Sequence, residues 1–153
     1  MPKIENVAAA DVPMGFHYRC GENSMLIQIM DVGSTWWPEP KHTFKERYKF
    51  EFMDVGDDAG DMLEFGCSEE QAIKLVNLLK HALENSMDVI VHCHAGICRS
   101  GAVVEVATMM GFEDTERFRL PNSRVKRLMM KELGLTYDST NDIYTQIEQR
   151  LNT

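Results

Sequence analysis

The sequence lacks the features that would place it in a membrane or among secreted, disulfide-bonded proteins. No apolar run approaches the roughly 18 residues that a membrane-spanning helix needs, so we expect no membrane contact. The N-terminus has no charged patch followed by an apolar core and a cleavage site, and we therefore expect no signal peptide. The four cysteines then favour reduced thiols in a cytoplasmic protein over two disulfides in a secreted one.

The chain also lacks basic clusters, repeats and low-complexity tracts. Its net charge of −8 repels nucleic acid, so we expect no nucleic-acid partner and only a local anion site. The histidines are too scattered for a metal site, and the acidic run from Asp54 to Asp61 lacks the ligand spacing of a calcium loop. We expect no metal and no other cofactor. The 153 residues, 44% hydrophobic and 26% charged, are typical of one globular domain over residues 1–153.

Hydrophobic patterning predicts alternating strands and helices. Residues 25–31 and 48–53 are predicted strands, and Asp88 to His92 is apolar on both parities, as in a strand buried on both faces of a parallel sheet. One helix is predicted from the capping box at Ser68, and a central helix from Arg99 to Met110. Two amphipathic helices follow, one with Val125, Leu128, Met129 and Leu133, the other with Ile143, Ile147 and Leu151. This order predicts an α/β domain with a central, mostly parallel sheet flanked by helices.

The ten residues from His92 to Gly101 carry the main functional signal. They place Cys93 directly after the buried strand and Arg99 at the start of the buried helix. Ligands of α/β sheets bind beyond the carboxyl ends of the strands, and a helix start offers unpaired N–H groups and a positive dipole end. The sequence therefore predicts an anion-binding loop, in which Gly96 gives the backbone the freedom it needs. The predicted phosphate loop consists of His94, Ala95, Gly96, Ile97, Cys98 and Arg99.

The residue types in this loop suit attack on phosphorus. A helix N-terminus and a guanidinium lower the pKa of a thiol from roughly 8.5 toward ~3.5–7.5, so Cys93 is the predicted nucleophile. The planar fork of Arg99 matches two phosphoryl oxygens. Ser100 is predicted to hydrogen-bond the Cys93 sulfur, and His92 to pack behind the loop and orient it.

The motif His-Cys-x-x-Gly-x-x-Arg-Ser resembles the signature of the protein tyrosine phosphatase superfamily, especially its small dual-specificity members and compact bacterial and phage relatives. Phe50 to Asp54 resembles the family's strand that ends in the general-acid aspartate, and Pro121-Asn122 resembles its Pro-Asn element. The resemblance spans roughly residues 25 to 135. It implies a phosphatase-like fold, a phosphocysteine intermediate, Asp54 as general acid and a supporting role for Asn122. It also implies a phosphoprotein or phosphopeptide substrate, with phosphate or another oxyanion in the loop.

Several alternatives stay open on sequence alone. Asp57, Asp58 and Asp61 share a loop with Asp54 and are rival general acids. Rhodanese-like sulfurtransferases also use a cysteine in a short anion-binding loop, although the Gly-x-x-Arg-Ser form argues against sulfur transfer. A non-catalytic phosphate-binding module and an RNA 5′-phosphatase are further alternatives. Cys98 stands where the family often has a small or hydroxyl residue, and it has either a packing or a redox role.

Overall fold

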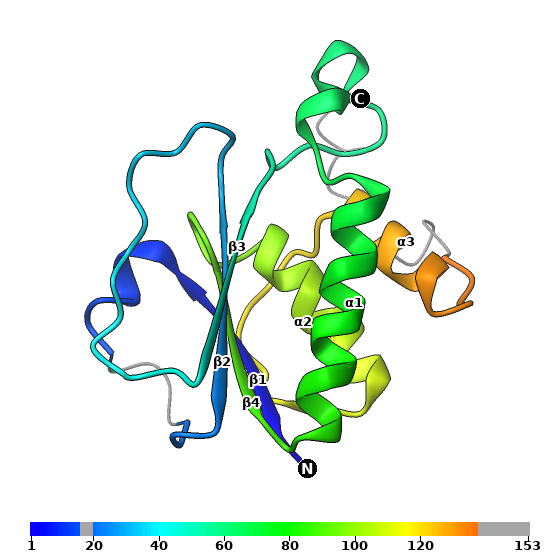
Figure 1. Ribbon diagram of the computed structural model, residues 1–153. Helices are drawn as coiled ribbons and strands as arrows, with labels where there is room; N and C mark the ends of the chain where they lie inside the picture. The colour runs from blue at the N-terminus through cyan, green and yellow to red at the C-terminus, as the bar shows by residue number, and fades with distance from the viewer. Residues whose placement is uncertain (16–19, 138–153) are drawn as a thin grey trace.

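The computed structural model describes residues 1–15 and 20–137, and a parallel five-stranded sheet forms its centre (Figure 1). The strands are β1 (Lys3–Ala8), β2 (Ser24–Met30), β3 (Glu46–Glu51), β4 (Asp88–Cys93) and β5 (Glu113–Asp114), in the spatial order β3-β2-β4-β1-β5. In the middle of the sheet, Val91 pairs with Ile27 on one side and Asn6 on the other. Strand β4 is therefore central, and its carboxyl end opens at the middle of the sheet edge.

Three α-helices cover one face of this sheet, and loops cover the other (Figure 1). The helices are α1 (Glu69–Glu84), α2 (Arg99–Met110) and α3 (Ser123–Glu132), and the two short 3-10 turns are η1 (Ala9–Asp11) and η2 (Gly60–Phe65). The main core lies between the helices and the sheet. A smaller cluster on the loop side contains Val7, Val12, Leu26, Phe44 and Ile90. Because β2 and β4 are buried on both faces of the sheet, they have apolar residues at both odd and even positions.

Local signals fix the ends of the helices. The Ser68 hydroxyl accepts a hydrogen bond from the Gln71 N–H, and the Gln71 side chain accepts one from the Ser68 N–H, which is the predicted capping box. Helix α2 ends at Gly111, whose φ of +120° favours glycine. Helix α3 begins after Asn122, whose side-chain oxygen accepts from the N–H of Val125.

The predicted α/β class, parallel sheet and element order are confirmed over the described residues, with two differences. Strands β1 and β5 were not expected, because β1 carries the polar pair Glu5-Asn6 and β5 has only two residues. The predicted strand over residues 48–53 lies two residues earlier, since the Met53 N–H leaves the sheet to bond the carbonyl of Phe65. The predicted helix with Ile143, Ile147 and Leu151 lies outside the described residues. Of the helices within the described part, none is long and apolar enough to span a membrane.

Candidate active site

Polar side chains follow the carboxyl ends of three strands, at one edge of the sheet. Strand β4 ends at Cys93, β2 is followed directly by Asp31, and β3 is followed three residues later by Asp54. Because the strands are parallel, their carboxyl ends meet at this edge. We call residues 93–99 the cysteine loop and residues 53–67 the Asp54 segment. The structure brings the two together, as the predicted site requires.

Cys93 lies at the base of the cysteine loop beside a hydroxyl group. Its side chain is only 2% exposed, and its Sγ is 3.1 Å from Oγ of Ser100, which is fully buried. Ser100 lies in the first turn of α2, whose N-terminus points at the loop. A hydroxyl at this distance can donate to a thiolate and stabilise its negative charge.

The backbone of the cysteine loop has the character of an anion-binding nest. Between His94 and Gly101, no N–H donates a hydrogen bond to another backbone group in the described part of the chain. Helix α2 also starts without a side-chain cap, which leaves the N–H groups of its first turn unpaired. Several donors therefore remain available to one bound oxyanion.

Strand β1 holds the cysteine loop from behind. The Asn6 side-chain amide, which is buried, donates to the carbonyls of Gly96 at 2.7 Å and Phe118 at 3.1 Å. Gly96 has a φ of +74°, and a Cβ there would lie 2.4 Å from the Ala8 nitrogen. Position 96 therefore requires glycine for both its conformation and its close approach to β1. Asn6 was not predicted from the sequence, because the first residues show no clear pattern of a helix or strand.

Arg99 is anchored on one side and unpaired on the other. Its side chain is buried, and Nη1 donates to Oδ1 of Asp31 and to the carbonyl of Phe52, each at 2.8 Å. The buried Nε has no hydrogen-bond partner among the described residues. A buried donor without a partner is costly, and a bound oxyanion would satisfy it. Asp31 was not predicted as a site residue either, although it follows β2 as Asp54 follows β3.

His92 is fully buried at the end of β4. Its Nδ1 is 3.4 Å from the carbonyl oxygen of Cys93, and its Nε2 has no partner in the described chain. Burial lowers the pKa of the imidazole from 6.5 to about 4. The ring is therefore neutral near pH 7, which suits packing behind the loop and not acid–base chemistry at the phosphorus.

Asn122 links the Asp54 segment to the cysteine loop. Its backbone N–H donates to the carbonyl of Cys98 at 2.9 Å, and its side-chain amide donates to Oδ1 of Asp54 at 2.7 Å. The same amide reaches the carbonyl of Val55 at 3.2 Å. Asn122 is fully buried, whereas Asp54 is exposed at the surface. This link places the Asp54 carboxyl beside the loop.

The rival aspartates have different surroundings. Asp57 accepts hydrogen bonds from Arg127 and Arg124, which hold the pKa of its carboxyl below the usual range. A general acid must carry a proton, so this environment is unsuitable for one. Asp58 and Asp61 are exposed and have no ion-pair partner in the described chain. Of the four aspartates, Asp54 is the one that accepts a hydrogen bond from Asn122, and Asn122 also bonds to the cysteine loop.

Cys98 has the surroundings of an unreactive thiol. Burial raises the pKa of its side chain to about 12, and the nearby charges of Asp54 and Cys93 act in the same direction. Its thiol therefore stays protonated near neutral pH. This environment favours the packing role over fast attack on an oxidised Cys93.

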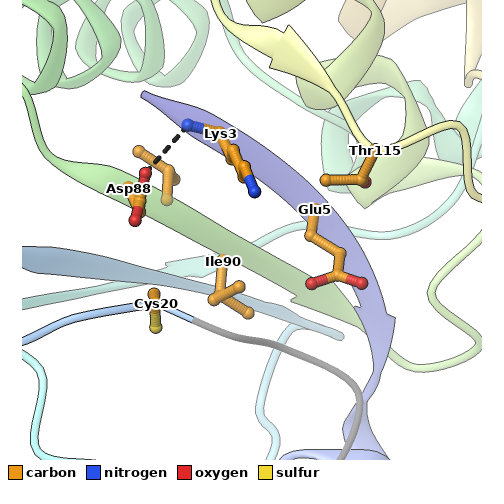
Figure 2. Close-up of a pocket in the computed structure, with 7 residues that line it drawn as sticks. Lys3, Glu5, Cys20, Asp88, Ile90 and Thr115 are labelled. Atoms are coloured by element: carbon orange, nitrogen blue, oxygen red, sulfur yellow. Dashed lines mark hydrogen bonds between the residues drawn. The ribbon is translucent and has the colours of Figure 1, made fainter. Parts of the chain in front are cut away.

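Among the cavities of the described surface, two lie near opposite ends of β4. One, of about 320 Å³, adjoins the cysteine loop and is lined by residues 30–36, including the half-exposed Trp36, and by His94. The other, of about 250 Å³, is at the opposite end of β4 and is lined by Lys3, Glu5, Cys20 and Asp88 among others (Figure 2). There the Lys3 N–H donates to the Asp88 carboxylate. Within the described residues, no group of three or more histidine, cysteine, aspartate or glutamate side chains is placed to hold a metal.

Comparison with known proteins shows one match in sequence and one in fold. Residues 61–111, about a third of the chain, match the family described as "Tc-R-P: Polymorphic toxin system, DSP-PTPase phosphatase". The human tyrosine phosphatase-like serine/threonine/tyrosine-interacting protein has a similar structure, with a TM-score of 0.52 and 13% identity over 99% of this chain and 94% of that one. At this identity the likeness shows the fold alone. No curated protein matches the chain. The chain thus resembles the tyrosine and dual-specificity phosphatase superfamily in fold and in sequence over residues 61–111, and neither match is to a sulfurtransferase.

Proposed function

We propose that the protein is a cysteine-dependent phosphomonoester hydrolase of the tyrosine or dual-specificity type. The observation that carries this proposal is that Cys93 and Arg99 are both buried, at the two ends of one short loop. The Cys93 sulfur is beside the Ser100 hydroxyl, and the Nε of Arg99 has no hydrogen-bond partner among the described residues. Thiolate, guanidinium and free N–H groups are the parts that phosphoryl transfer to cysteine needs.

In the first step, the Cys93 thiolate attacks phosphorus in line with the ester oxygen. The S–P bond forms as the P–O bond to the leaving group breaks, and Asp54 gives its proton to the departing oxygen. Arg99 and the loop N–H groups bind the three equatorial oxygens, where negative charge is spread in the transition state. Asp31 holds the guanidinium in place through Nη1.

In the second step, water cleaves the phosphocysteine. Asp54, now ionised, takes a proton from water as the water oxygen attacks phosphorus, and the S–P bond breaks. The Ser100 hydroxyl stabilises the thiolate that leaves, because it lies within hydrogen-bond distance of the sulfur. Inorganic phosphate is released, and both Cys93 and Asp54 return to their starting protonation states.

The proposed substrate is a phosphoprotein or phosphopeptide. The cysteine loop exposes His94 and Ala95 at the surface while Cys93 and Arg99 lie buried at its base. A phosphorylated side chain therefore has to enter the site from outside, and the neighbouring recess with Trp36 offers apolar surface to the residues around it.

Turnover of p-nitrophenyl phosphate tests the proposal. We expect the wild type to release phosphate and vanadate to inhibit it competitively. Cys93→Ser should fold and still bind vanadate but lose turnover, because a serine hydroxyl is not ionised near neutral pH. Wild-type activity in Cys93→Ser would refute the assignment of the nucleophile. Release of thiocyanate from thiosulfate and cyanide, without phosphate release, would instead identify a sulfurtransferase.

A further inference from the structure

Apart from Cys67 at its end, which is buried in the main core, the Asp54 segment has little apolar attachment to the rest of the protein. Its 3-10 turn η2 contains no buried residue, and Met62 and Phe65 are 45% and 39% exposed. Hydrophobic burial, which usually fixes a segment, is therefore weak here. Polar links must supply much of what keeps this segment in place.

Asp57 makes the main ionic link between the segment and α3. Its Oδ2 accepts from Nε of Arg127 at 2.6 Å, and its Oδ1 accepts from Nη2 of Arg127 at 2.9 Å and from Nη1 of Arg124 at 2.7 Å. The contact with Arg127 is the two-pronged carboxylate–guanidinium geometry, which is more specific than a single ion pair. Arg124 and Arg127 are three residues apart on α3 and so lie on one side of the helix.

The same end of α3 holds the segment at two further points. Nε of Arg124 donates to the carbonyl of Cys67 at 2.8 Å, where the segment ends. Asn122, directly before the helix, donates to Asp54 and Val55, where the segment begins. Asp57 lies between these two points, so its ion pairs fix the stretch of chain that follows Asp54.

We infer that Asp57 is a positioning residue, whose bonds to Arg124 and Arg127 hold the Asp54 carboxyl against the cysteine loop. The inference deepens the proposed function and rests on it for the role of Asp54. Both Asp57 oxygens are occupied by guanidinium donors. Asp57 acts through the backbone, because its carboxylate has no contact with Cys93 or Arg99 among the interactions of the described residues.

The kinetic test compares a poor and a good leaving group. Asp57→Asn keeps the size of the side chain but loses its charge, and we expect kcat on phenyl phosphate to fall about tenfold, since misplacing a catalytic group is costly. On p-nitrophenyl phosphate, whose leaving group departs without a proton, the loss should stay under about twofold. Glu64→Gln, an exposed carboxylate of the same segment without an ion pair in the described chain, is the control.

Arg127→Gln should reproduce part of the effect of Asp57→Asn, because Arg124 still binds the Asp57 carboxylate. The double variant should be no worse than Asp57→Asn alone, because removing the carboxylate charge already breaks the link to Arg127. The pH–rate profile of Asp57→Asn should keep the form of the wild type at a lower height, since the acid itself is still present. Equal losses on both substrates would show general damage and overturn the inference.

Hydrogen exchange tests the positioning without relying on activity. We expect the hydrogen-bonded amides of Met53, Val55 and Ala59 to exchange at least about tenfold faster in Asp57→Asn than in the wild type, with Glu64→Gln unchanged. If Asp57→Asn exchanges like the wild type, the positioning role is wrong even where the phosphatase proposal stands. If exchange is faster in Asp57→Asn but the wild type does not turn over p-nitrophenyl phosphate, the structural role of the ion pairs stands. The proposed phosphatase function is then wrong.

Discussion

Nη1 of Arg99 donates to the Asp31 carboxylate at 2.8 Å, and this bond orients the guanidinium so that its buried Nε stays unpaired within the described chain. A buried donor with no protein partner costs free energy until a ligand pairs with it. An oxyanion with two acceptor oxygens would remove that cost through the fork of the guanidinium. The pair therefore links the end of β2 to ligand binding at the end of β4.

The first prediction concerns this pair. In Asp31→Ala, Arg99 loses one of its two Nη1 anchors, so we expect the inhibition constant for vanadate and the kcat/KM on p-nitrophenyl phosphate to worsen about tenfold each. Arg99→Lys, which keeps the charge but loses the fork, should lose more than about tenfold in kcat. If Asp31→Ala matched the wild type in both measurements, Asp31 would not orient Arg99.

The second prediction concerns Gly96. In Gly96→Ala, the added Cβ would meet the Val7 and Ala8 backbone at 2.4 Å, at a φ of +74°. We expect the free energy of unfolding in urea to fall by about 3 to 5 kcal/mol, or the loop to distort with loss of activity. Gly134→Ala is the control, because its φ is +73° but nothing lies within 4 Å of its Cβ. That variant should lose only about 1 kcal/mol. Equal losses in the two variants would mean that the contact with β1 is unimportant.

The third prediction concerns pH and His92. The unfolded imidazole binds a proton near pH 6.5, whereas burial lowers the folded pKa to about 4. Between these values the unfolded chain binds more protons, so stability rises with pH across this window and is complete above it. His92 should contribute about 3 kcal/mol to the loss of unfolding free energy between pH 6.5 and pH 4.

Urea unfolding of the wild type and His92→Asn at several pH values measures this contribution. Acidic residues affect both proteins alike, so the difference in slope isolates His92. Parallel pH curves for the two proteins would show that His92 protonates as easily in the folded state as in the unfolded chain.

The fourth prediction assigns the general acid. Asp54→Asn should lose far more rate on phosphopeptides, which have poor leaving groups, than on p-nitrophenyl phosphate. Its kcat profile should also change form on the acidic limb, which distinguishes it from Asp57→Asn. If Asp58→Asn or Asp61→Asn showed this leaving-group dependence while Asp54→Asn did not, the acid would be the other aspartate.

Much of this site is predictable from the sequence, because its central residues are positioned by the strand and helix next to them in the chain. Cys93 follows a doubly buried strand and Arg99 opens a buried helix, and both features are visible in hydrophobic patterning. Strand β1 was not predictable in this way. Its Asn6 is polar because it bonds the Gly96 carbonyl 90 residues later in the chain.

The roles of Asp31 and Asp57 were not predicted from the sequence, because both depend on contacts between segments that are far apart in the chain. Asp57 and Arg127 are 70 residues apart, and nothing in their local sequence favours the pairing over exposure to solvent. The partnership of Asp31 with Arg99 spans 68 residues, although the rule that strand ends converge already marks the residue after β2. The partners of these residues can be identified only once the three-dimensional fold is known.

Trapping of the covalent intermediate tests the central claim most directly. The wild type is mixed with an aryl phosphate carrying a labelled phosphoryl group, quenched within its first turnovers, and digested to locate the label. We predict a labelled phosphocysteine at Cys93 and none in Cys93→Ser. Steady release of labelled phosphate from the wild type, with no label on Cys93 at any quench time or with the label on another residue, would contradict this claim.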